Sequence, residues 1–287
     1  LTIDKCELPE KLELEDKWVL SKLNTLIKEV TDNMEAYELG VASAKVYDFI
    51  WDTFCDWYIE LTKSRMQGDD EEAKIAAQNV LCYVLIEMLK LLHPFMPFIT
   101  EEIYQALPHD EKDTFIMTSA WPVYDEKLSF PAEEAAMEKV MDAIRAIRGR
   151  RPEMNVPPSR KVKLIIATEE QDVFAAGIPF FQRLASASEV EIVQKAPSPE
   201  GMVSVVTHAA RLFMPLAELV DVEQELQRIA KEREKAQKGL DMVEKKLSNE
   251  AFVSKAPEAV VNAEREKAEK FRALIAQLDQ SAAAMGK

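Results

Sequence analysis

The sequence predicts a mainly α-helical protein with a small α/β segment between two helical parts. Apolar residues recur at helical spacing through most of the first 150 residues, a short β-branched stretch follows, and a heptad pattern fills the last part of the chain. We therefore expect a helical bundle at 1–151, a connector module at 152–218 and an antiparallel coiled-coil hairpin at 219–287.

The composition bounds the class of protein. The 287 residues are 47% hydrophobic, which is enough for two domains with buried cores. No run of 18 apolar residues is present, so no membrane span is expected. The three cysteines, Cys6, Cys55 and Cys82, have no CxxC spacing and no histidine cluster beside them. This pattern indicates a reducing, cytoplasmic compartment and argues against a zinc site.

The helices of the first part follow from apolar spacing and from breakers. The pattern predicts helices at 12–30, 35–66, 73–93, 99–107 and 133–149. Pro94, Pro97 and Pro108 bound the short fourth helix, and a loop after it is expected to pack Trp121 and Pro122 onto the bundle.

One acidic ladder raises the question of catalysis. Asp48, Asp52, Asp56 and Glu60 recur every four residues, a spacing that suits either a carboxylate site or a solvated helix face. The solvated face is favoured because no histidine accompanies the ladder. The chain also has no Gly-rich phosphate loop, nucleophile elbow or HExxH motif, so we predict no catalytic residue, metal ligand or cofactor site within it.

A short basic segment stands out in a chain of net charge −15. Residues 1–144 carry 30 acidic against 13 basic residues, so any contact with nucleic acid must be local. The candidate anion-binding residues of the segment are Arg145, Arg148, Arg150, Arg151, Asn155, Arg160, Lys161 and Lys163. The alternative is that these cations are solvated or paired with acids. The helix before them should stop near Gly149 and Pro152, and 155–159 should be an extended or turn linker.

The pattern changes after this linker. Residues 161–167 alternate and are β-branched, residues 174–185 suit a helix, and residues 190–193 and 202–206 suit short strands separated by a turn-rich stretch. These elements predict a small module of two to four strands.

The last part has two heptad helices. Apolar positions step by three and four from Leu219 to Leu247 and again from Val261 to Ala282. An antiparallel hairpin would pair large residues with small ones, such as Leu240 with Ala268. The predicted cations of its first helix and turn are Arg228, Lys231, Lys235, Lys238, Lys245, Lys246 and Lys255. They could bind phosphates as a strip, or be solvated and ion-paired, and a parallel dimer is the alternative to the hairpin.

Several strings together resemble one family. They are LEDKWVLSKLN, YDFIWDTFCDWYIEL, LLHPFMPFITEEIYQALP, RAIRGRRPEMNVPP and KKLSNEAFVSKAPEAVV. They are similar to bacterial valyl-tRNA synthetases, from within the anticodon-binding domain to the C-terminus. The resemblance implies a bundle that engages the anticodon arm of valine tRNA and a coiled coil that braces the outer corner of the tRNA.

The resemblance also sets limits. Neither HIGH nor KMSKS occurs in the sequence. The catalytic domain, which would use ATP and Mg²⁺, is therefore expected to lie outside this chain. The chain is expected to be a C-terminal fragment that is inactive by itself. The family's first bundle helix would precede Leu1. A cytoplasmic monomer that binds tRNA, and neither DNA nor membranes, is expected. The alternative function is a coiled-coil interaction or dimerisation module on an acidic scaffold.

Overall fold

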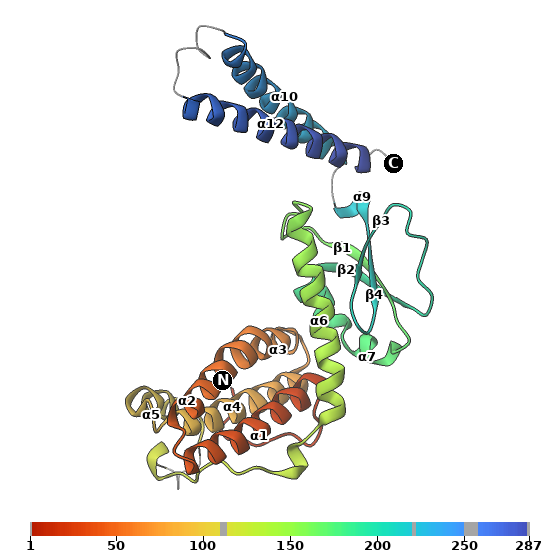
Figure 1. Ribbon diagram of the computed structural model, residues 1–287. Helices are drawn as coiled ribbons and strands as arrows, with labels where there is room; N and C mark the ends of the chain where they lie inside the picture. The colour runs from red at the N-terminus through yellow and green to blue at the C-terminus, as the bar shows by residue number, and fades with distance from the viewer. Residues whose placement is uncertain (1, 110–113, 220–221, 250–257, 286–287) are drawn as a thin grey trace. The chain divides into compact units, whose positions relative to one another are not determined.

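The computed structural model describes residues 2–109, 114–219, 222–249 and 258–285, and the protein is mainly helical as predicted (Figure 1). The helices of the first part are α1 (Leu14–Glu35), α2 (Leu39–Asp48), the π-helix η1 (Phe49–Tyr58), α3 (Ile59–Met66), α4 (Glu71–Leu92), α5 (Pro97–Gln105) and α6 (Pro131–Glu153), with the 3₁₀ turns η2 (Ile116–Thr118) and η3 (Glu126–Leu128). Each predicted helix of the bundle is present.

The second predicted helix differs from the expectation in two ways. It begins at Leu39 rather than near Glu35, because Tyr37 takes a φ of +60° and separates it from α1. Its middle is the π-helix η1, which buries Phe54 and Trp57. Apolar spacing predicts a helical run but does not distinguish an α-helix from a local π segment, since one extra residue per turn only widens the apolar stripe.

Helix α4 is the central helix of the bundle. Among the described residues it is the one helix that is long and apolar enough to cross a membrane, and half of its most apolar window is buried inside the protein. It contacts α1, α2, α3 and α5, and Val80, Val84 and Leu91 on it are fully buried. These contacts are those of a core helix.

A buried ionic network joins α1 to the end of α3. Asp16, which is fully buried, accepts hydrogen bonds from the Tyr58 hydroxyl at 2.8 Å and from Arg65 Nη1 at 2.9 Å. Arg65 Nη2 lies 2.5 Å from Asp16 Oδ1 and 2.9 Å from Glu15 Oε1. Two neighbouring carboxylates therefore share one guanidinium inside the bundle.

The α/β module has four strands in the order β2-β1-β4-β3. They are β1 (Val162–Ala167), β2 (Ala187–Val193), β3 (Met202–Val206) and β4 (Arg211–Pro215), with the helices α7 (Gln171–Ala176), α8 (Ile178–Leu184) and α9 (Leu216–Leu219). The single helix expected at 174–185 is instead the pair α7 and α8, divided at Gly177. A Cβ on Gly177 would lie 2.9 Å from Val140 Cγ1, so only glycine lets this corner approach α6 so closely.

The last part is the predicted hairpin of two long helices, α10 (Val222–Leu247) and α12 (Glu258–Met285), which contact each other along their length. Arg272 Nη2 lies 2.7 Å from Glu244 Oε1, and Arg233 Nε lies 2.6 Å from Asp279 Oδ1, so the helices are antiparallel. Leu240, Val243 and Ala268 form the buried centre of the seam, with Leu247, Phe271 and Ile275 packed against it.

Gly239 gives the seam a specific fit. A Cβ there would lie 2.7 Å from Phe271 Cζ, whereas a Cβ on Gly149 in α6 would have no atom within 4 Å. We expect Gly239→Ala to lower the free energy of unfolding of the arm by about 1 kcal/mol, since overpacking outweighs the helix propensity gained. Gly149→Ala is the matched control and should raise the free energy of unfolding by about 0.5 kcal/mol. Urea unfolding followed by circular dichroism measures both, and equal gains in stability would contradict the fit.

The described chain forms two compact units. One comprises Leu1–Arg150, Lys163–Pro197 and Val205–Leu212, and the other comprises Arg151–Val162, Ser198–Ser204 and Phe213–Lys287.

Candidate nucleic-acid interface

Three arginines of the basic segment are exposed on α6. The guanidinium of Arg145 lies 4.8 Å from the ring centre of Trp57, which is a cation–π contact, and its side chain is still exposed. Arg148 is exposed one turn further along the helix. Arg150 is also exposed, and it has interaction partners within the protein. The aromatic ring holds Arg145 in place, which the sequence pattern did not indicate.

Arg151 is placed differently from its neighbours. It is only 6% exposed, and its Nη2 donates to the carbonyl oxygens of Arg160 and, at 3.4 Å, of Pro157. Burial lowers the pKa of its guanidinium. Arg151 is three residues after Arg148 in a helical segment and was a candidate anion-binding residue, but its side chain turns inward and bonds to the carbonyls of the linker and Arg160. It is therefore not part of the exposed basic surface.

Asn155 ends α6. Its φ of +55° is in the left-handed region, its N–H donates to Pro152 O at 3.0 Å, and Val156 N–H donates to Arg151 O at 3.1 Å. These bonds make a Schellman motif with asparagine in the left-handed position and buried Val156 after it. The helix ends at Glu153, near the predicted stop at Gly149 and Pro152, with Pro152 in its last turn.

The cations after the linker differ in their surroundings. Arg160 is half-buried, and its Nε donates to Glu218 O in α9 at 2.6 Å. Lys163 on β1 lies 2.9 Å from Glu191 Oε2 on the neighbouring strand β2. Lys161 is exposed. Of these three side chains, Lys161 is the one that the structure leaves most open to a ligand.

Most predicted cations of the arm lie along one face of α10. The members of this face, which we call the α10 stripe, are Arg228, Lys231, Lys235, Lys238 and Lys245, with Met242 between the last two lysines; all are exposed. With 3.6 residues per turn, the stripe lies opposite the buried seam residues Ile229, Ala236, Leu240 and Val243. It spans about 26 Å at 1.5 Å per residue and contains no acidic residue.

Some of these cations form ion pairs with carboxylates and others do not. Arg228 Nη1 lies 2.7 Å from Glu232 Oε1, and Lys238 Nζ lies 2.7 Å from Glu234 Oε1. Such exposed i,i+4 pairs are weak and open readily to a competing anion. Lys231, Lys235 and Lys245 are exposed and have no ion pair of this kind in the described part of the arm.

Lys246 is not counted in the stripe, because its side chain approaches a carboxylate of the partner helix. Lys246 points toward Glu264 of α12, at 3.8 Å from Oε1, and so is directed toward the partner helix. Lys255 lies outside the described residues. On α12, Arg265 and Lys270 are exposed, whereas Lys267 and Arg272 are 2.9 Å and 2.7 Å from carboxylate oxygens.

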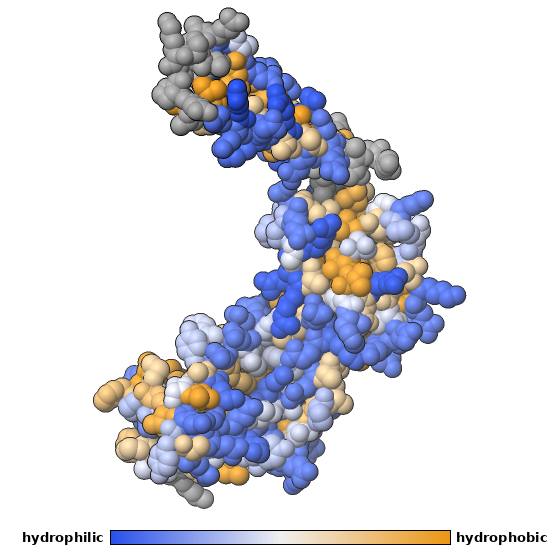
Figure 2. All heavy atoms as spheres, viewed as in Figure 1, coloured by the Kyte–Doolittle hydropathy of each residue, from blue (hydrophilic) through white to orange (hydrophobic). Residues whose placement is uncertain are grey.

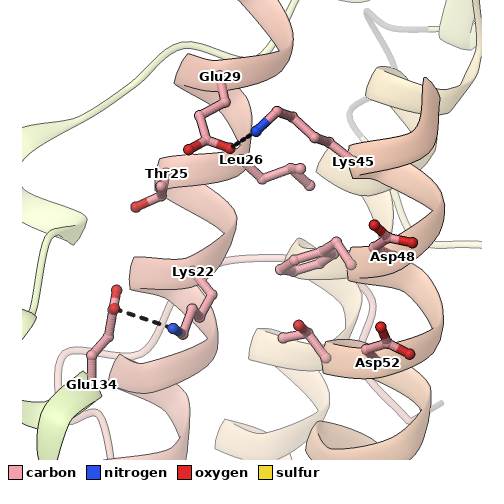
Figure 3. Close-up of a pocket in the computed structure, with 10 residues that line it drawn as sticks. Lys22, Thr25, Leu26, Glu29, Lys45, Asp48, Asp52 and Glu134 are labelled. Atoms are coloured by element: carbon pink, nitrogen blue, oxygen red, sulfur yellow. Dashed lines mark hydrogen bonds and ion pairs between the residues drawn. The ribbon is translucent and has the colours of Figure 1, made fainter. Parts of the chain in front are cut away.

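The first two members of the acidic ladder line a shallow pocket of about 340 Å³ between α1 and the helices α2 and η1 (Figure 3). Asp48 and Asp52 face it, and Lys45 Nζ lies 2.6 Å from Glu29 Oε2 on the opposite helix. Lysines thus pair with the two glutamates that line the pocket, Glu29 and Glu134. No group of three or more His, Cys, Asp or Glu side chains with the geometry of a metal site occurs within the described ranges.

The surface of the arm suits a polyanion better than an apolar partner. Its described face in Figure 2 is predominantly hydrophilic, with smaller apolar patches between the charged side chains. A long two-helix arm carrying a stripe of cations is a form in which phosphates can be bound without a pocket.

Comparison with known proteins agrees with this geometry. The family described as the anticodon-binding domain of tRNA ligase matches residues 16–166, which is more than half of the chain. The chain belongs to this family. A second family, the valyl tRNA synthetase tRNA binding arm, matches residues 221–286, and so the anticodon-binding domain is followed by the arm that the hairpin forms.

Relatives extend over the whole chain. The valine–tRNA ligase of Clostridium acetobutylicum is 50% identical over 286 residues, which are 99% of this chain and 32% of that protein. Those of Clostridium perfringens and Geobacillus stearothermophilus are 51% and 41% identical, over 95% and 94% of this chain and 31% of each relative. The chain thus spans about a third of these relatives' length. It corresponds to the C-terminal region of a valyl-tRNA synthetase, the family that the sequence motifs resemble.

Proposed function

We propose that this chain positions valine tRNA for aminoacylation by a catalytic part of valine–tRNA ligase that lies outside it. In this proposal residues 1–151 bind the anticodon arm, residues 152–218 connect the two tRNA-binding parts, and residues 219–287 bind the outer corner of the tRNA. The parent enzyme would act in the cytoplasm as a monomer and would use ATP and Mg²⁺ at its catalytic part. The names and extents of the relatives support this assignment.

The α10 stripe is the observation that carries the proposal. Its cations lie on the face opposite the seam, so they can bind phosphates without disturbing the packing of the two helices. The net charge of −15 disfavours unspecific attraction of nucleic acid by the chain as a whole. Binding must then rest on local surfaces such as this one and the exposed arginines of α6.

Fluorescence anisotropy of labelled tRNA at several salt concentrations tests the proposal. The triple variant Lys231→Gln, Lys235→Gln, Lys245→Gln should weaken tRNA binding by about tenfold or more, since each phosphate contact releases counterions. The slope of log affinity against log salt should fall by about 2 to 3, at about 0.9 per lost contact. Salt-sensitive binding of both valine tRNA and a noncognate tRNA would show that the chain binds shape and phosphates.

A matched variant controls for net charge. Arg233→Gln, Lys267→Gln, Arg272→Gln also removes three positive charges from the arm, but from side chains that lie outside the α10 stripe and are paired with carboxylates. It should bind tRNA nearly as the parent does. Equal losses of tRNA affinity in the two triple variants would contradict the assignment of the stripe, provided that circular dichroism shows both variants to be folded.

The seam also bears on the dimerisation alternative. The apolar positions that a parallel dimer would use are filled by α12 of the same chain. We therefore expect a monomer in sedimentation equilibrium, and a concentration-dependent dimer would support the interaction module instead.

A further inference from the structure

Two of the three cysteines, far apart in sequence, meet on the surface of α4. Cys6 is half-buried in the segment before α1, and Cys82 is buried on α4. Cys6 packs against the cluster formed by Cys82, Ile86, Leu89, Tyr104 and Ile116. Two cysteines can form a disulfide where their Cα atoms come within about 7 Å of each other.

Further contacts fix the first segment on α4. Thr2 N–H donates to Gln78 Oε1 at 2.7 Å, Glu7 N–H donates to Asn79 Oδ1 at 3.1 Å, and Cys6 Sγ lies 3.7 Å from Asn79 O. Asn79 precedes Cys82 by one turn of α4. The segment therefore lies in a set register that places the thiol of Cys6 beside the turn of α4 that precedes Cys82.

The pair is accessible from solvent on one side. Cys6 lines a cavity of about 620 Å³ whose walls include Glu87, Lys90, Tyr104 and His109. Cys82 lies behind Cys6 in the apolar cluster. A small oxidant that enters the cavity reaches the sulfur of Cys6 first.

We propose that Cys6 and Cys82 are a site of reversible oxidation, at which a peroxide converts the two thiols into an intramolecular disulfide that links the first segment of the chain to α4. The sulfur of Cys6 attacks one peroxide oxygen, the O–O bond breaks, and water and a sulfenic acid result. The sulfur of Cys82 then attacks the sulfenic sulfur, the S–S bond forms, and a second water leaves. Two thiols lose two electrons, and one peroxide is reduced to two waters.

The pKa shifts of the two thiols favour the second step, the attack of Cys82 on the sulfenic acid. The neighbouring Cys6 thiol lowers the pKa of Cys82, which favours the thiolate on the sulfur that attacks the sulfenic acid. The neighbouring Cys82 thiol and burial raise the pKa of Cys6, which makes the first step the slower one.

Peroxide treatment of the reduced chain tests the proposal, with alkylation of the remaining thiols and mass spectrometry of unreduced peptides. We expect loss of two of the three free thiols, a linked peptide pair containing Cys6 and Cys82, and recovery of all three thiols with dithiothreitol. The oxidised chain should also unfold at a higher temperature, because the bond closes a long loop.

Variants make the test specific. Cys6→Ala, in a coil segment, should abolish the linked peptide while keeping the circular dichroism of the parent, and Cys55→Ser should leave the reaction unchanged. Oxidation of Cys55 at the same rate without a Cys6–Cys82 peptide would overturn the proposal. Disulfides between chains, or sulfinic acids in place of the internal bond, would overturn it as well.

Discussion

Replacing Arg65 with methionine is expected to lower the free energy of unfolding by about 3 to 5 kcal/mol, because it leaves two carboxylates buried without their counter-charge. Asp16 would lose both of its bonds to the guanidinium, and Glu15 would lose its ion pair. Methionine fills a similar volume, so the loss reports the charges and not a cavity. This is a large fraction of the stability of an ordinary domain.

Urea unfolding at pH 7, followed by tryptophan fluorescence, measures this effect. Arg183→Met is the matched control, since Arg183 is exposed and donates only to the Gln67 side chain among the contacts described for it. Its free energy of unfolding should change by less than about 0.5 kcal/mol. A similar small change for Arg65→Met would mean that the network adds little to stability.

Glu15→Gln is expected to stabilise the protein at pH 8 by up to about 3 kcal/mol and to leave it unchanged near pH 4. Burial raises the pKa of Glu15 to about 7, and the attraction of Arg65, which Asp16 shares, is too weak to offset burial. A carboxyl that binds its proton more tightly in the folded state contributes most below pH 4.5. That contribution is lost as the pH rises from 4.5 toward 7.

The measurement is the free energy of unfolding in urea at a series of pH values for the parent and the variant. The difference between them should grow from pH 5 to pH 7 and then stay constant. Glu133→Gln is a control of opposite sign, because the hydrogen bond from Lys17 lowers the pKa of Glu133. A difference for Glu15→Gln that does not vary with pH would contradict the raised pKa.

Much of the fold could be predicted because its helices are amphipathic and its arm is a heptad repeat. The seam residues Leu240 and Ala268 meet as their spacing predicts. What could not be predicted depends on contacts between distant residues. The division at Gly177 reflects its approach to Val140, and β4 was not expected because Arg211–Pro215 has few of the alternating residues that mark a strand.

In the candidate site, too, the contacts of single side chains with distant residues could not be predicted. The positions of its cations are visible in the sequence, but their partners are not. Arg151 turns inward because the carbonyls of a later linker accept its bonds, and Lys163 meets Glu191 only because β1 and β2 are neighbours. By contrast, the pair of Lys238 with Glu234 follows from helical spacing alone.

The position of the α10 stripe opposite the seam has a consequence for how such an arm can change in length. Each added residue turns the rest of a helix by about 100°, so a single insertion in α10 would carry Lys245 away from Lys231 and Lys235 and would misalign the seam as well. Seven residues added to α10, with seven added to α12 opposite them, return both faces almost to register. Lineages could therefore lengthen the arm in whole heptads, extending its reach along a bound polyanion while its charged face stays aimed in one direction.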